Sequence, residues 1–248
     1  MKSKKYNTTQ LCPEQQHQIH RDYIAHCLRW VHVIKHAPKS QATVLDFGCG
    51  TGNLYEILYR SKYNLRRYIG LDIRQGVIDN NIKRFPKIDW YVEDLVNMKK
   101  IYKVDDGWDI IACFEVLEHV GKQNAQHILK NIKDHCDKHT MVFISSPCYD
   151  EQVGAAGNHT YDSGDGRGVA VQEFTYHEMK NMLKIYFTIE KVYGTFISQK
   201  DYKHLLNDWQ QKMFDGLKDY FDSNMLSNIM APFFPRQARN CLWRCKLK

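Results

Sequence analysis

The sequence lacks the features that would place the protein in a membrane or outside the cell. No apolar run approaches the roughly 20 residues that a helix needs to cross a bilayer. Residues 1–6 are basic, but no apolar segment follows them, so we expect no secretory signal. These absences predict a cytoplasmic protein without a membrane partner.

Cysteine is present but lacks the spacing of a disulfide framework or a metal site. None of the eight cysteines forms a CxxC pair, so we expect reduced thiols. Cys241 and Cys245 have no histidine or cysteine nearby at zinc spacing, which argues against a zinc site there. The chain also lacks internal repeats, low-complexity tracts and a convincing domain boundary, and its 248 residues suffice for one domain.

The chain has no arginine-rich run, although its formal net charge is +7. A basic balance can attract nucleic acids or phosphorylated compounds, or it can simply keep a protein soluble. Hydrophobic residues make up 43% of the chain and charged residues 25%, which is typical of a globular protein. Composition therefore leaves the partner undecided between a small molecule and a nucleic acid.

Hydrophobic spacing predicts helices that alternate with strands. Between residues 13 and 36, apolar residues recur every three or four positions, which is typical of a helix with one buried face. Short apolar segments follow, with helical patterns between them; the predicted strands are 42–47, 68–72, 90–92, 108–113 and 141–145, and the predicted helices are 53–60, 75–84 and 125–137. Such alternation indicates a parallel sheet with right-handed crossovers.

The second half of the chain is less regular. Residues 147–172 have the composition of a long loop, which in a compact domain is usually functional or disordered. The elements expected after it are a helix at 173–183, a sixth strand at 187–196, a helical stretch at 201–222 and a final strand at 240–247.

The most informative segment is a glycine-rich loop directly after the predicted strand 42–47. Gly48, Gly50 and Gly52 form a G-x-G-x-G pattern between a strand and a helix. Glycine is needed where the backbone turns tightly and comes close to a ligand. Glycine-rich loops also bind dinucleotides, but those loops have the spacing G-x-G-x-x-G. Here the spacing is G-x-G-x-G, and an acidic residue, Asp46, precedes the first glycine.

Acidic residues end the next two predicted strands. Asp72 lies about 20 positions after the loop, where an acid can accept hydrogen bonds from both ribose hydroxyls. Glu93 and Asp94 follow the third strand, where a carboxylate can accept from an adenine amine. Each acid alone could equally be an ordinary loop residue, and Asp94 a helix N-cap. The ordered combination of loop and acids favours a cofactor site.

Together these segments resemble class I S-adenosylmethionine-dependent methyltransferases over roughly residues 40–195. The resemblance implies an α/β fold: a doubly wound, mostly parallel sheet of seven strands with a reversed last strand and helices on both faces. It implies S-adenosylmethionine as the cofactor. The cofactor-binding residues that it implies are Asp46, Gly48, Gly50, Gly52, Asp72, Asp94 and Phe114.

We expect a single methyltransferase domain over residues 1–248, in four parts. Their order is an N-terminal lid helix in 1–40, the cofactor-binding core in 41–195, a helical insertion in 196–237 and the final strand in 238–248.

The segment after the fourth strand carries candidate catalytic residues. Glu115, Glu118 and His119 are spaced i, i+3 and i+4, so on a helical turn they would share a face. With His159 as a fourth ligand, they could bind a divalent cation. This pattern resembles the ubiquinone-pathway catechol O-methyltransferases and the small-RNA 2′-O-methyltransferases, which hold a metal beside the acceptor hydroxyl. That resemblance implies Mg²⁺ or another divalent cation.

A metal-free interpretation of the same segment stays open. Glu118 could cap backbone amides while His119 packs or acts as a base. A glycine-rich insert separates His159 from residues 173–175, which departs from the pattern of the metal-dependent groups.

The sequence favours O-methylation of a small-molecule or nucleotide hydroxyl, because the Glu115, Glu118 and His119 group could remove a hydroxyl proton. The alternatives are an RNA or DNA methyltransferase and a non-catalytic, S-adenosylmethionine-binding partner subunit. The Asn/Asp-Pro-Pro-Tyr/Trp motif of amino-methylating DNA enzymes is absent, and Cys148 is favoured as a loop cysteine over a nucleophile.

The chain is also similar to methyltransferases encoded in bacteriophage genomes.

Overall fold

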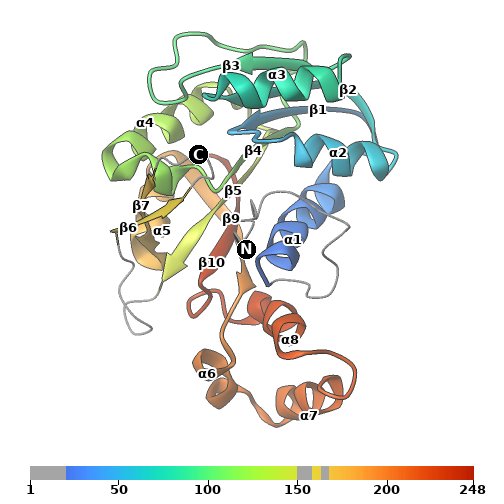
Figure 1. The fold of residues 1–248 in the computed structure, drawn as a ribbon, viewed down its shortest axis with the longest axis vertical. Coiled ribbons are helices and arrows are strands. Elements are labelled where there is room, and N and C mark those ends of the chain that lie inside the picture. The colour runs from blue at the N-terminus through green and yellow to red at the C-terminus, as the bar shows by residue number, and fades with distance from the viewer. Residues whose placement is uncertain (1–20, 150–157, 163–167) are drawn as a thin grey trace, which may run out of the picture.

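The computed structural model describes residues 21–149, 158–162 and 168–248. Its central sheet has the strand order β3-β2-β1-β4-β5-β10-β9, and the short β8 pairs with the end of β5 (Figure 1). The strands are β1 (Ser40–Phe47), β2 (Asn64–Asp72), β3 (Asp89–Val92), β4 (Ile110–Phe114), β5 (Met141–Tyr149), β8 (Phe174–Thr175), β9 (Phe187–Phe196) and β10 (Asn240–Leu247).

The sheet is mostly parallel, and its last strand is reversed. The pairs β1–β2, β2–β3, β1–β4 and β4–β5 are parallel, whereas β10 runs antiparallel to both β5 and β9. The predicted fold class is confirmed. The strand order reverses between β1 and β4, and in open α/β sheets ligands bind at the carboxyl ends of the strands beside such a point.

Helices cover both faces of the sheet (Figure 1). Apolar side chains of α1 (Arg21–His36), α2 (Asn53–Arg60) and α3 (Gln75–Arg84) pack on one face. Those of α4 (Gly121–Asp134) and α5 (Tyr176–Tyr186) pack on the other. Because both faces are covered, β1 is buried continuously from Ala42 to Phe47, including the polar side chains of Thr43 and Asp46.

A separate helical lobe lies between β9 and β10 in the chain, at the end of the sheet where β9 stops (Figure 1). It consists of α6 (Gln199–Tyr202), η3 (Lys203–Leu205), α7 (Asp208–Leu217), α8 (Ser223–Met230) and η4 (Ala231–Phe233). A small core of its own holds it together, including Tyr202, Phe214 and Met230. Within the residues described, no helix is long and apolar enough to span a bilayer.

The stretch 201–222 is mostly helical, as expected, but polar side chains cap a new helix within it and another at its end. Asn207 and Gln210 exchange backbone-to-side-chain hydrogen bonds of 2.9 and 3.0 Å in a capping box that begins α7. The carboxylate of Asp222 accepts from two backbone N–H groups and begins α8. These bonds satisfy the backbone amides at the helix starts. The helices are therefore interrupted at positions where the spacing of apolar residues alone shows no interruption.

The loop expected over 147–172 contains regular structure in its described parts. β5 extends to Tyr149, and the segments Asn158–Asp162 and Gly168–Gln172 pair as the antiparallel strands β6 and β7. The segment Asn158–Asp162 is mostly polar, so the sequence shows no apolar alternation there that would predict a strand.

Aromatic rings fill the space beside Gly70 on β2. This aromatic wall consists of Tyr55, Tyr68, Phe85 and Trp90, whose neighbouring ring centroids lie 4.9–6.2 Å apart. A Cβ atom at Gly70 would lie 2.3 Å from Trp90 Cε3. A side chain at this position is therefore excluded by a buried ring.

The variant Gly70→Ala should lower the free energy of unfolding by about 1–3 kcal/mol, the usual cost of overpacking a core. Gly76→Ala is the matched control: its Cβ meets no atom within 4 Å, and alanine in helix α3 should stabilise by about 0.5–1 kcal/mol. Urea denaturation measures both, and equal stabilities would contradict the close packing at Gly70.

Candidate cofactor and active site

The glycine loop after β1 is fastened to the carboxyl end of β2. The backbone N–H groups of Gly48 and Cys49 both donate to the carbonyl oxygen of Leu71 at 2.8 Å. The N–H of Gly50 donates to Asp72 Oδ2 at 3.0 Å. The predicted loop and the predicted acid are thus brought together where the strand order reverses.

Neighbouring side chains leave no room for anything but glycine at two positions of the loop. Gly48 has a φ of 75°, and a Cβ there would lie 2.3 Å from Val116 Cγ2. Gly52 has a φ of 77°, and a Cβ there would lie 2.9 Å from Cη2 of Trp90. The loop therefore lies between the segment after β4 and the aromatic wall.

The space beside Gly50 is open, and Asp72 lies at its edge. An added Cβ at Gly50 would have Arg74 Nη2 as its nearest atom, at 3.9 Å. The buried Asp72 carboxylate also accepts from the backbone and guanidinium of Arg74 at 2.9–3.0 Å. The Arg74 side chain is 60% exposed, so a ligand hydroxyl can displace its guanidinium at small cost.

Asp94 follows β3, and its carboxylate closes a turn. It accepts from the backbone N–H of Val96 at 2.9 Å and from the side-chain amide of Asn97 at 2.8 Å. The Asn97 amide, with help from backbone N–H groups, holds the pKa of Asp94 below its usual range. In this structure Asp94 therefore has the turn-forming role that the sequence left open, and its role at adenine stays a prediction.

Asp46 is a buried carboxyl group at the end of β1. Burial, with a further contribution from the charge of Asp72, raises the pKa of Asp46 to about 7. The hydroxyl of Tyr68 donates to Asp46 Oδ2 at 2.5 Å and acts in the opposite direction. A titratable acid thus lies just below the cofactor loop.

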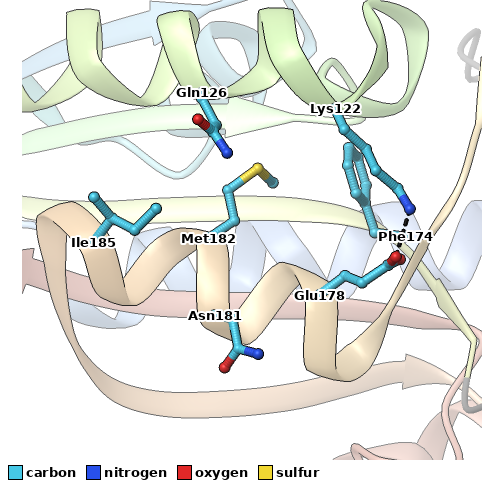
Figure 2. A pocket seen from close by; sticks show the side chains of 7 residues that line it. All are labelled: Lys122, Gln126, Phe174, Glu178, Asn181, Met182 and Ile185. Atoms are coloured by element: carbon cyan, nitrogen blue, oxygen red, sulfur yellow. Dashed lines mark hydrogen bonds and ion pairs between the residues drawn. The ribbon is translucent and has the colours of Figure 1, made fainter.

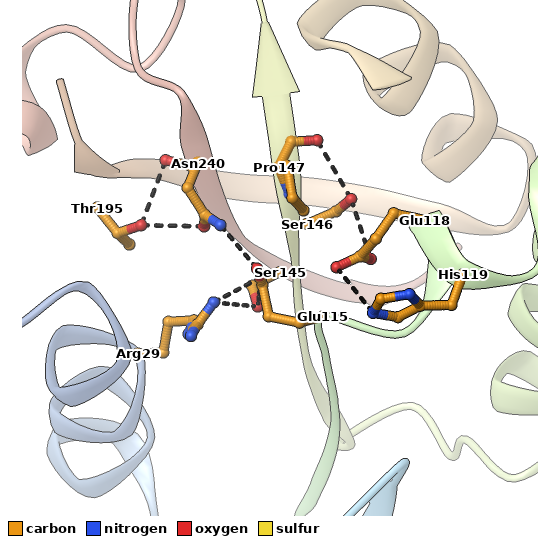
Figure 3. Close-up of polar contacts among 9 residues, drawn as sticks. All are labelled: Arg29, Glu115, Glu118, His119, Ser145, Ser146, Pro147, Thr195 and Asn240. Carbon is orange, nitrogen blue, oxygen red and sulfur yellow. Dashed lines mark hydrogen bonds and ion pairs between the residues drawn. The ribbon is translucent and has the colours of Figure 1, made fainter. Parts of the chain in front are cut away.

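Glu115 belongs to a polar network that joins α1 to three strands (Figure 3). Its Oε1 lies 2.5 Å from Nη1 of the buried Arg29 and accepts from Ser145 Oγ at 2.8 Å. Its Oε2 accepts from Asn240 Nδ2 at 2.8 Å, and Asn240 in turn accepts from Thr195 at 3.0 Å. Both carboxylate oxygens therefore have partners within the protein.

The expected helical face of Glu115, Glu118 and His119 is wrong. Glu115 has a φ of 54°, in the left-handed region, and it lies outside the short 3₁₀-helix η2 (Leu117–His119) that follows. This backbone turn directs Glu115 toward Arg29, while Glu118 and His119 lie together elsewhere (Figure 3). The spacing rule fails because it assumes continuous helix from residue 115.

Glu118 and His119 form a second group beside the end of β5. Glu118 accepts from Ser146 Oγ at 3.4 Å, and its Oε1 lies 3.9 Å from His119 Nε2. Burial, with the nearby charge of Glu115, raises the pKa of Glu118 well above its usual range. This environment favours the protonated form of Glu118, and the His119 side chain beside it is 27% exposed.

The predicted metal ligands do not converge in the part of the chain that is described. Glu115 is committed to Arg29, and Glu118 is buried away from it. The backbone of His159 lies in β6, and its side chain is outside the described residues. No group of three or more possible ligands occurs among the described residues. Metal binding through all four residues stays a prediction.

Sequence reasoning missed several residues of the site. Phe114 is the last residue of β4, one residue beyond the predicted strand, and its role at the cofactor stays a prediction. Arg29, Val116 and Asn240 were not predicted. A charged residue next to Trp30, in the apolar pattern of the first helix, was the available signal for Arg29. Val116 and Asn240 gave no signal because their roles depend on contacts between distant segments.

A surface pocket of about 310 Å³ lies between α4 and α5 (Figure 2). An ion pair between Lys122 and Glu178 crosses one end, and Met182 and Ile185 supply apolar lining. Its lining comes from α4, α5 and β8, and none of it from the glycine loop or its acids. This pocket is therefore separate from the candidate cofactor site at the glycine loop.

Comparison with known proteins gives the family. The family model for the methyltransferase domain matches residues 16–231. The chain belongs to this family. No curated protein matches the methyltransferase in a sequence search.

Solved structures share its fold. A TehB-like methyltransferase from Corynebacterium glutamicum has 17% identity and a TM-score of 0.56, covering 89% of this chain and 87% of its own. An S-adenosylmethionine-dependent methyltransferase from Clostridium acetobutylicum has 13% identity and a TM-score of 0.58, covering 93% of each chain. The N-methyltransferase NodS from Bradyrhizobium japonicum, bound to S-adenosylhomocysteine, has 13% identity and a TM-score of 0.52, covering 90% and 87%.

S-adenosylmethionine, the cofactor that the sequence resemblance implies, is the methyl donor expected for a methyltransferase domain. The residues fit that cofactor, because the open space beside Gly50 is bordered by the buried Asp72 carboxylate. The backbone of Gly50 and the carboxylate of Asp72 are the groups that would hold it.

Asp72→Asn should weaken the binding of S-adenosylhomocysteine at least about tenfold, because hydrogen bonds to a charged group are worth roughly 1.5–3 kcal/mol. Calorimetric titration measures the affinity. Asp79→Asn on the exposed part of α3 is the control and should leave it unchanged. Equal affinity of wild type and Asp72→Asn would contradict the assignment.

Arg29→Met should lower the free energy of unfolding by about 3 kcal/mol, because it leaves the Glu115 carboxylate without its counter-charge. Adding Glu115→Gln should recover most of the loss. Arg66→Met removes an exposed pair with Asp106 and should cost less than about 1 kcal/mol. Equal effects of Arg29→Met and Arg66→Met in thermal unfolding would contradict a buried ion pair.

Proposed function

We propose that the methyltransferase transfers a methyl group to a hydroxyl group of a small molecule or a nucleotide. The position of His119 carries the proposal. Its partly exposed imidazole lies beside Glu118, in the same segment as Val116, which packs against Gly48 of the cofactor loop. A proton acceptor is thus held on the segment that contacts this loop.

The sulfonium methyl of S-adenosylmethionine is a strong electrophile, so the protein mainly has to align an acceptor and exclude water. A hydroxyl acceptor must also lose its proton, and we assign this proton to His119. Glu118 is 2% exposed, so the partly exposed His119 beside it is the more accessible base. Glu115 does not compete either, because its oxygens accept from Arg29, Ser145 and Asn240.

The 147–172 segment and the helical stretch at 201–222 would enclose the acceptor, and the N-terminal helix would cover the cofactor. Two observations support this proposal: α1 packs against α8 and β9, and Arg29 of α1 reaches Glu115 at the end of β4. The cytoplasmic location and the likeness to bacteriophage enzymes stay predictions.

His119→Asn should lower kcat by about 10²–10⁴, the usual contribution of a general base, while the affinity for S-adenosylhomocysteine stays within about twofold. The exposed His127 on α4 provides the control, since His127→Asn should change neither quantity. Unchanged kcat in His119→Asn would remove His119 as the base.

Transfer of a labelled methyl group to a cell extract identifies the acceptor class. Label in solvent-extractable material supports the small-molecule proposal, and an alkali-stable methyl ether in the isolated product supports oxygen as the acceptor. Label in a nuclease-sensitive fraction supports an RNA or DNA substrate instead. No label in any fraction supports the partner-subunit alternative. Loss of transfer with a chelator and recovery with Mg²⁺ would support the metal prediction.

A further inference from the structure

Tyr68 on β2 buries its ring and donates its hydroxyl to Asp46. The side chain is 2% exposed, and its oxygen lies 2.5 Å from Asp46 Oδ2. In the register of β1 and β2, Tyr68 is opposite Val44 and Gly70 is opposite Asp46. Because Gly70 has no side chain, the Trp90 ring can pack there, beside the ring of Tyr68.

Two aromatic rings and a backbone N–H group hold this hydroxyl in position. The ring centroids of Tyr55 and Trp90 lie 5.2 and 5.5 Å from that of Tyr68. The backbone N–H of Tyr55, in the first turn of α2, donates to the phenol oxygen. Since the oxygen already accepts this bond, its own proton is directed at Asp46. Trp90 also contacts the loop at Gly52, so one wall supports both the loop and the hydroxyl.

The other ionisable groups that face Asp46 are acidic. They are the carboxylate of Asp72 at the end of β2 and the thiols of Cys49 in the loop and Cys113 on β4. Burial raises the pKa of both thiols, so they are neutral. Burial and the charge of Asp72 favour the protonated form of Asp46, whereas the Tyr68 hydroxyl favours the carboxylate.

S-adenosylmethionine carries positive charge on its sulfonium and on its amino group, so it binds better beside a carboxylate than beside a neutral carboxyl group. We propose that Tyr68 is a positioning residue that keeps Asp46 ionised below the loop, so that binding of the cationic cofactor is coupled to proton release from Asp46. The inference rests on cofactor binding at the loop and is independent of the methyl acceptor.

Calorimetric titration with S-adenosylmethionine between pH 5.5 and pH 9 tests the proposal. In wild type the affinity should fall as the pH drops through about 7, where Asp46 gains a proton. Without the Tyr68 hydroxyl, the pKa of Asp46 rises further. Tyr68→Phe should therefore bind about fivefold more weakly at pH 7 and recover wild-type affinity near pH 9.

Two further variants separate this effect from a structural one. Tyr55→Phe removes a hydroxyl from the same aromatic wall and leaves the Tyr68–Asp46 bond in place, so its pH profile should match wild type. Asp46→Asn should bind weakly and lose the pH dependence near 7. Proton release, counted by repeating the wild-type titration in buffers of different ionisation enthalpy, should disappear in this variant.

The results of these titrations separate a failure of the proposed role of Tyr68 from a failure of cofactor binding at the loop. If Tyr68→Phe weakens binding equally at every pH, Tyr68 has only a structural role and the inference is overturned. A profile identical to wild type overturns it as well. If wild type binds S-adenosylmethionine at no pH while thermal unfolding shows it folded, cofactor binding at the loop fails instead.

Discussion

The close packing of the glycine loop between two fixed neighbours is the constraint on which this site depends. On one side Val116 occupies the position that a side chain at Gly48 would need, and on the other Trp90 does the same at Gly52. The loop therefore connects the segment after β4 to the aromatic wall behind β2. Any shift of either neighbour alters the open space beside Gly50, and with it the surface available to the cofactor.

The acidic residues near the loop differ in function because they differ in burial and partners. Asp72 offers an ionised acceptor whose present partner, Arg74, is exposed and displaceable. Asp46 is buried beneath the loop and has a pKa of about 7. Burial and the charge of Glu115 raise the pKa of Glu118 although Arg29 acts in the opposite direction, whereas Glu115 has Arg29 directly beside it. Local environment, more than residue type, assigns each carboxyl group its role.

The buried Arg29–Glu115 pair explains how helix α1 is tied to the site. An unpaired buried charge is costly, so once Arg29 is enclosed between α1 and the sheet, Glu115 must face it. The left-handed backbone at Glu115 directs the carboxylate there. The same turn separates Glu115 from Glu118 and His119, and the His119 side chain beside Glu118 is partly exposed.

The α/β class, the glycine loop and the acid at Asp72 could be predicted from the chain alone, because apolar periodicity and glycine spacing are local properties. The reversed last strand followed from the resemblance to class I methyltransferases. The helical stretch over 201–222 was expected, but the capping side chains that divide it into separate helices were not. The shared face of Glu115, Glu118 and His119 was predicted wrongly, because one residue leaves helical geometry. Only the tertiary structure decided the partners of Asp46, Gly48 and Glu115, because those contacts join segments that are 22 to 125 residues apart in the chain.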